Sequence, residues 1–145
     1  MNNLILESLE VNRVDVALEN RPLPNAALTA GAHTVTIAEI QNGVIRMDPT
    51  ADRAFTAPTA ALAVAGTPGC NVGDCIDFSI INIGTPGEDE VITLSAGTGG
   101  VLIGSGAVLT PDPTDAAFSS GSGLFRLQFT NVTASSEAIN IIRLA

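Results

Sequence analysis

The sequence contains no lysine, no tryptophan and no tyrosine. All six of its basic residues are arginine, and they stand against fifteen Asp and Glu, so that the formal net charge is −9. A protein that binds nucleic acid needs a basic surface to neutralise phosphates, and anionic membranes attract the same kind of surface. We therefore expect neither nucleic acid nor a membrane among the partners.

Charged residues of both signs are scarce. They make up 14% of the 145 residues, whereas 46% are hydrophobic. A soluble globular chain usually carries about a quarter charged residues. The shortfall indicates that other subunits cover part of the surface. The length fits one domain with a single core, so the composition favours a small protein that assembles.

The residues needed for catalysis are also scarce. His33 is the only histidine, and no Ser lies in the strand–turn–helix elbow of a hydrolase. Without Trp or Tyr, the chain lacks aromatic platforms for sugar rings. Residues 97–100 (GTGG) contain no Lys and lead into an expected strand, so they predict a turn and not a phosphate-binding loop. We expect no enzyme and no catalytic residue, with His33 as an ordinary polar residue where a strand begins.

Acidic side chains gather in three expected turns. Calcium is conceivable there because hard cations take loop carboxylates and carbonyls, but no stretch has the EF-hand spacing. Asp and Glu in turns more commonly bind backbone amides and stay solvated. We expect no metal ion and no cofactor. The three groups are Asp48 with Asp52, then Glu88, Asp89 and Glu90, and finally Asp112 with Asp115.

The stretch RMDPTADR (46–53) allows two readings, a carboxylate pair for chemistry or a charged loop that leads into a helix. No base, aromatic platform or set of metal ligands accompanies it in the sequence. We interpret it as a charged turn in which Arg46 pairs with Asp48 or Asp52. Its expected role is to redirect the chain.

Cys70 and Cys75 are the only cysteines. The N-terminus has no basic region, and Glu7 and Glu10 interrupt its apolar residues, so we expect no signal peptide and reduced thiols. Two cysteines without a nearby histidine cannot complete a zinc tetrahedron. We expect both to be small buried apolar residues that need no disulfide.

Short alternating stretches separated by Gly and Pro predict an all-β fold, either a β-sandwich or a barrel-like arrangement. One short helix is expected over 57–66, with Pro58 in its first turn and Thr56 as a candidate cap. Alternation places Ile76, Phe78, Ile80, Phe125, Leu127 and Phe129 on inward faces. The strands at 101–104 and 107–110 are expected to be joined by a Gly-Ser-Gly turn. Strands are predicted at 33–37, 44–47, 75–83, 91–96, 101–104, 107–110, 124–131 and 138–144.

The chain divides into an N-terminal arm (1–18), a linker rich in Pro and Ala (19–32) and a β-sandwich domain (33–145). The arm is mostly apolar and alternates like an extended strand. Two interpretations of it stay open. It is either a device that attaches the protein to a neighbouring subunit or shell by strand addition, or the first strand of the sandwich.

Four segments resemble a group of small structural proteins of tailed phages and large viruses. They are VIRMDPTADRAFTAPTAALAVAG (44–66), VGDCIDFSIINIG (72–84), VITLSAGTGG (91–100) and FTNVTASSEAINIIRL (129–144). The family pattern has a strand with an Arg-x-Asp-Pro turn, an alanine-rich helix and hairpins with these motifs. This sequence departs from it at Cys75 and in having Asn140-Ile141-Ile142 where Thr-Ile-Tyr is common. The resemblance covers about residues 33 to 144 and leaves out the arm.

The resemblance implies a β-sandwich that associates as a trimer and a function in capsid cement or decoration. The expected partner is the major capsid protein, and the expected location is the outer capsid surface of the virion. The alternative is a receptor- or glycan-binding module of a phage fibre or tail. That alternative calls for exposed aromatic anchors, and five Phe without Trp or Tyr supply them poorly.

Overall fold

The computed structural model describes residues 28, 30–86, 89–111 and 121–145. The expected arm (1–18) and most of the expected linker (19–32) lie outside these residues, so both stay predictions. Leu28 makes an isolated parallel bridge to Met47, and its N–H donates to the carbonyl oxygen of Arg46 at 2.8 Å. This end of the expected linker therefore already contacts the folded domain.

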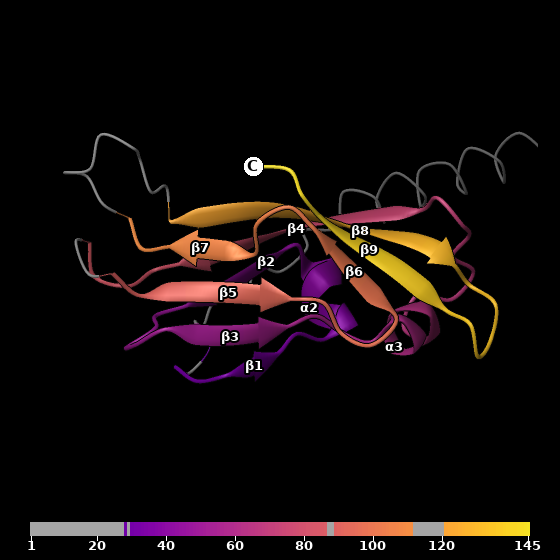
Figure 1. The fold of residues 1–145 in the computed structure, drawn as a ribbon, viewed down its shortest axis with the longest axis horizontal. Coiled ribbons are helices and arrows are strands. Elements are labelled where there is room, and N and C mark those ends of the chain that lie inside the picture. The colour runs from indigo at the N-terminus through magenta and orange to yellow at the C-terminus, as the bar shows by residue number, and fades with distance from the viewer. Residues whose placement is uncertain (1–27, 29, 87–88, 112–120) are drawn as a thin grey trace, which may run out of the picture.

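The described residues form two mixed sheets, and neither closes on itself (Figure 1). The prediction of a predominantly β fold is confirmed. The four-stranded sheet has the order β1 (His33–Thr34), β3 (Arg53–Thr56), β5 (Val91–Ser95) and β7 (Ala107–Leu109). The five-stranded sheet has the order β2 (Val44–Met47), β4 (Cys75–Asn82), β8 (Ser122–Asn131), β9 (Ala138–Arg143) and β6 (Gly100–Ile103).

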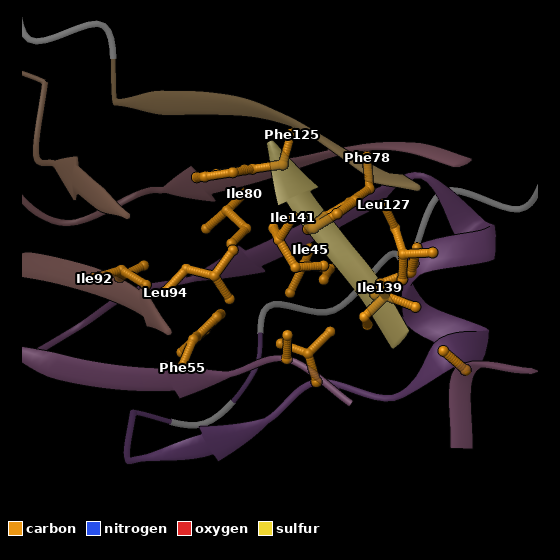
Figure 2. Packing of buried hydrophobic residues seen from close by; sticks show 14 of the residues in the cluster. Ile45, Phe55, Phe78, Ile80, Ile92, Leu94, Phe125, Leu127, Ile139 and Ile141 are labelled. Atoms are coloured by element: carbon orange, nitrogen blue, oxygen red, sulfur yellow. The ribbon is translucent and has the colours of Figure 1, made fainter. Parts of the chain in front are cut away.

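Both sheets bury their apolar side chains in one common core (Figure 2). Alternation along β4 and β8 places the expected residues inward, and Phe78, Ile80, Phe125, Leu127 and Phe129 are each at most 1% exposed. The rings of Phe78 and Phe125 stack with centroids 5.6 Å apart. The four-stranded sheet contributes further core side chains, namely Phe55, Ile92, Leu94 and Val108.

The fold contains two short helices in the described residues, α2 (Ile37–Asn42) and α3 (Ala60–Ala65), where one was expected. The strand predicted over 33–37 begins at His33 as expected but ends at Thr34, and the prediction is wrong for 35–37 because Thr36 begins a capping box with Glu39. This reciprocal pair satisfies backbone N–H groups at the helix start and outweighs the β preference of Val and Ile. The helix ends at Gly43, whose φ of 85° suits glycine.

The second helix, α3, starts later than expected. Its cap is Thr59, whose hydroxyl accepts the N–H of Leu62 at 3.3 Å, and not Thr56. Thr56 instead ends strand β3, which pairs in parallel with β5. Pro58 therefore lies before the helix.

The charged turn expected over 46–53 is shorter in the structure, because its first residues belong to β2 and its last residue belongs to β3.

Strands β6 and β7 follow each other across Gly104, Ser105 and Gly106 but do not pair with each other. Strand β6 pairs in parallel with β9, and β7 pairs antiparallel with β5. Gly104 has a φ of 94°, a conformation that favours glycine. The expected glycine-rich connection is thus the point where the chain passes from one sheet to the other.

Candidate functional surface

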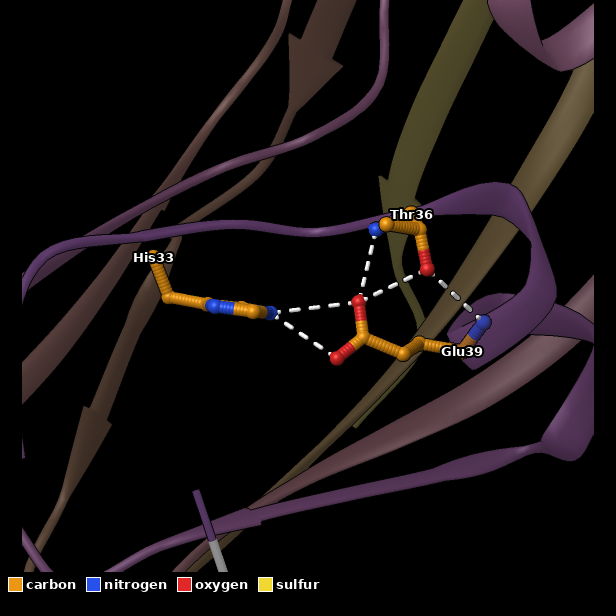
Figure 3. A network of polar contacts seen from close by, with 3 residues as sticks. All are labelled: His33, Thr36 and Glu39. Carbon is orange, nitrogen blue, oxygen red and sulfur yellow. Dashed lines mark hydrogen bonds and ion pairs between the residues drawn. The ribbon is translucent and has the colours of Figure 1, made fainter. Parts of the chain in front are cut away.

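The single histidine belongs to a helix-capping network (Figure 3). His33 Nε2 lies 2.9 Å and 3.1 Å from the two carboxylate oxygens of Glu39. Glu39 Oε2 also accepts the Thr36 N–H at 2.7 Å and the Thr36 hydroxyl at 2.9 Å. The His33 ring meets Phe55 edge-on, with centroids 5.4 Å apart. His33 therefore stands where β1 begins, as expected, and ties that strand to the first turn of α2.

The loop between β2 and β3 is held by short polar contacts. Asp52 Oδ1 accepts the N–H of Val91 at 2.9 Å, and Arg53 Nη2 donates to the hydroxyl of Thr50 at 2.9 Å. The first contact fastens the loop to the start of β5. The expected pairing of Arg46 with Asp48 or Asp52 stays a prediction.

The other acidic groups are only partly described. Glu88, Asp112 and Asp115 lie outside the described residues, whereas Asp89 is exposed and Glu90 is half-buried. Across 28, 30–86, 89–111 and 121–145, no three His, Cys, Asp or Glu side chains gather where they could hold a metal ion. The expectation of no metal ion at the acidic turns stays a prediction.

The two cysteines have different surroundings, and both are free thiols. Cys70 is partly buried and packs against the core. Cys75 is exposed and donates from Sγ to the carbonyl of Gly73 at 3.3 Å. The prediction of two buried cysteines is therefore wrong for Cys75. Side chains alternate along β4, and that of Cys75 is on the side that faces away from the core.

The glycine-rich stretch 97–100 forms a turn between β5 and β6, as predicted. The N–H of Gly100 donates to the carbonyl of Gly97 at 2.9 Å, and Gly99 has a φ of 77°. A side chain at Gly99 would meet Ala60 at the start of α3. The turn brings α3 and the beginning of β6 together.

The five-stranded sheet has one side that faces away from the core, which we call the outer sheet face. Because side chains alternate along each strand, the registers assign which residues stand next to each other on this face. One row contains Val44, Ser79 and Leu124. The next contains Asp77, Arg126, Ile142 and Ile103, and the third contains Cys75, Gln128, Asn140 and Val101.

An ion pair lies at the middle of the outer sheet face. Arg126 donates from Nε to Asp77 Oδ1 at 2.6 Å and from Nη2 to Asp77 Oδ2 at 2.8 Å. These hydrogen bonds lower the pKa of Asp77 and raise that of Arg126. An open depression of about 360 Å³ adjoins the pair and is also lined by Gln41, Cys75 and Ile76. Because the two charges neutralise each other, the depression has little net charge to offer a ligand.

Apolar side chains surround this ion pair toward the β6 edge. Val101 and Ile103 are 57% and 45% exposed, and Leu124 is 38% exposed. Leu144 follows β9, is 42% exposed, and donates its N–H to the carbonyl of Leu124 at 2.8 Å. Exposed apolar side chains gathered on one face are typical of an interaction surface.

Further exposed apolar residues lie on other elements. Leu62 of α3 and Val72 of the loop before β4 are 60% and 64% exposed, and Leu109 of β7 is 51% exposed. Leu62 is exposed because α3 buries Ala60 and Ala63 on its opposite side. Exposed apolar side chains in the described residues are therefore not confined to the outer sheet face.

No protein family, curated protein or solved structure was found to match the chain. In the described part of the chain, no helix is long and apolar enough to cross a membrane. The role of the outer sheet face is therefore argued from the side chains that it presents. This face was not predicted from the sequence, although a signal was present. Leu124 alternates with the core residue Phe125, and Val101 and Ile103 alternate with Leu102, which packs against the core.

Proposed function

We propose that the chain is a virion structural protein, a capsid cement or decoration protein whose two sheets form a β-sandwich. It binds the major capsid protein on the outer surface of the shell and stabilises contacts between capsid subunits. The observation that carries the proposal is the outer sheet face, where exposed aliphatic side chains lie beside an ion pair whose two charges neutralise each other. Such a surface suits a long-lived contact between proteins.

The composition supports the same proposal. Only 14% of the residues are charged, which fits a protein whose surface is partly covered in an assembly. A cement protein contacts both its own copies and the shell, and exposed apolar residues on different elements offer more than one contact. Leu62 and Val72 are candidates for the shell contact, and the outer sheet face is the candidate for contact between copies in a trimer.

The experiment that tests this function is the composition of purified particles of the source virus. A cement protein is present in numbers comparable to the major capsid protein, and its removal lowers the temperature at which particles disrupt. A receptor-binding module of a fibre or tail is present in far fewer copies, and its removal leaves particle disruption unchanged. The second result, or a complete absence from particles, overturns the proposal.

The contact region can be tested with a pair of variants. Leu62→Asp adds a charge at the proposed shell contact, and Leu109→Asp adds the same charge at a residue of similar exposure on β7. We expect Leu62→Asp to lose binding to particles stripped of the protein and Leu109→Asp to keep it. Equal loss or equal retention would contradict the assignment of the shell contact.

A further inference from the structure

We propose that residues 4–18 of one copy bind the outer sheet face of a neighbouring copy. The inference deepens the proposed assembly function and rests on it, since it assigns the contact between copies. Four observations support it: where the preceding chain reaches the sheet, how far it can extend, the pattern of its apolar residues, and its charge.

The chain that precedes the described residues arrives at the five-stranded sheet itself. Leu28 is bridged to Met47 and bonded to Arg46 on β2, the edge strand of that sheet. Residues 19–27 then separate Leu28 from the arm. Nine residues extend up to about 30 Å, whereas the five strands are about 19 Å across. Residues 19–27 are therefore long enough to carry the arm across the outer sheet face of an adjacent copy.

The apolar residues of the arm suit the apolar part of the face. Leu9 and Val11, and then Val14, Val16 and Leu18, recur at every second position. The parity changes between Val11 and Val14, so an extended segment over 14–18 presents Val14, Val16 and Leu18 on one side. Leu9 and Val11 join that side through a bulge at Asn12 and Arg13. Val101, Ile103 and Ile142 form a matching apolar group on neighbouring strands of the outer sheet face. Contact between the two groups removes both from water.

Charge does not oppose contact between the two surfaces. Residues 4–18 contain Glu7, Glu10 and Asp15 against the single Arg13, which leaves two net negative charges. The outward positions of the five strands carry Arg46, Arg126 and one acid, Asp77, although the chain as a whole has a net charge of −9. The face is thus an exception in an acidic protein, and an acidic segment meets no excess of like charge there.

A neighbouring copy, and not the same chain, is the partner we infer. Exchange of an arm from each copy to the next is a heterologous contact, and such contacts close into a ring when the rotation between copies permits. In a closed ring of three copies, each arm is bound and each outer sheet face is occupied, in agreement with the proposed trimer. It also covers surface in a chain that has unusually few charges.

Three variants of the full chain test the exchange. Val14→Glu with Val16→Glu disables the arm, and Val101→Glu with Ile103→Glu disables the face by placing acids opposite an acidic segment. Leu109→Glu is the matched control, because Leu109 is similarly exposed on a strand of the other sheet. The arm and face variants are each expected to be monomers by light scattering or native mass spectrometry, whereas the control keeps the wild-type mass. Circular dichroism and a cooperative melt identify variants that remain folded.

Mixing the variants decides between exchange and self-binding. The face variant still has an intact arm, and the arm variant still has an intact face. One arm–face contact can then form between the two variants, so we expect a dimer that contains one copy of each. Two monomers that stay separate would overturn the inference, as would an arm variant that keeps the wild-type mass or a control that loses it. Binding of the wild-type protein to particles is measured separately, so that failure of this inference is distinguished from failure of the proposed function.

Discussion

Arg143 of β9 donates from Nη1 to the carbonyl oxygen of Ala107 on β7, at 2.9 Å. The two residues belong to different sheets, so this hydrogen bond connects them where the chain has just passed from β6 to β7. The guanidinium carbon also lies 4.9 Å from the centroid of the Phe125 ring. Burial lowers the pKa of Arg143, yet its position and contacts remain those of a charged donor.

We expect Arg143→Ala to destabilise the domain because it leaves the carbonyl of Ala107 without this donor and removes the contact with Phe125. A hydrogen bond from a charged group contributes about 1.5–3 kcal/mol. The free energy of unfolding from urea titration measures the loss. Arg143→Lys keeps the charge but not the planar fork, so it should recover only part of the stability. Full recovery by Lys would show that charge alone matters.

The inward and outward residues of β8 provide a second comparison. Phe129→Ala removes a ring that is 1% exposed, whereas Leu124→Ala shortens a side chain that is 38% exposed on the outer sheet face. We expect a loss of about 3–5 kcal/mol for the first and within about 0.5 kcal/mol for the second. Chemical denaturation of both variants gives these values. Similar losses would mean that the assignment of faces along β8 is wrong.

The two long strands were predictable because their local pattern and their final environment agree. In β4 and β8, apolar residues alternate with polar ones, and the alternation alone places Phe78 and Phe125 in the core. Helix α2 was missed because Val35 and Ile37 look like strand residues, while the capping box formed by Thr36 and Glu39 determines the backbone there. Local hydrogen bonding outweighed side-chain preference at this point.

The pairing of strands could not be predicted from the same pattern. Strands β6 and β7 are close in sequence, yet β6 pairs with β9 and β7 with β5. This choice depends on packing between distant segments, which no local window contains. The outer sheet face was missed for that reason, since Ile103 and Ile142 become neighbours only through the register of β6 with β9.

The Asp77–Arg126 pair predicts a pH-dependent contribution to stability. Because Arg126 lowers the pKa of Asp77, folding favours the ionised carboxylate. The contribution is fully present above the pKa of Asp in the unfolded chain, about 4, and is lost as the pH falls through the lower pKa of the folded protein. It is small because both side chains are more than a third exposed.

Asp77→Asn should therefore reduce stability slightly at pH 7 and make a smaller difference at pH 2. Urea unfolding of both proteins at the two pH values measures this, and added salt should shrink the difference at pH 7 because the pair is exposed. A difference that grows as the pH falls would contradict the direction of the pKa shift. Ser79→Ala, on the same strand, is a control that should show no such pH dependence.

The loop between β2 and β3 gives the last prediction, in which two neighbouring acids differ. Both side chains are exposed, but Asp52 accepts the backbone N–H of Val91. Asp52→Ala removes the acceptor and should cost about 0.5–1.5 kcal/mol, while Asp48→Ala should change stability by less than about 0.5 kcal/mol. Asp52→Asn keeps an acceptor oxygen, so its loss of stability should fall between the other two.

Thermal melts with calcium and with a chelator complete the test, and we expect the wild-type melting temperature to be the same in both. A rise of several degrees with calcium that disappears in both Ala variants would instead assign this loop to a bound cation.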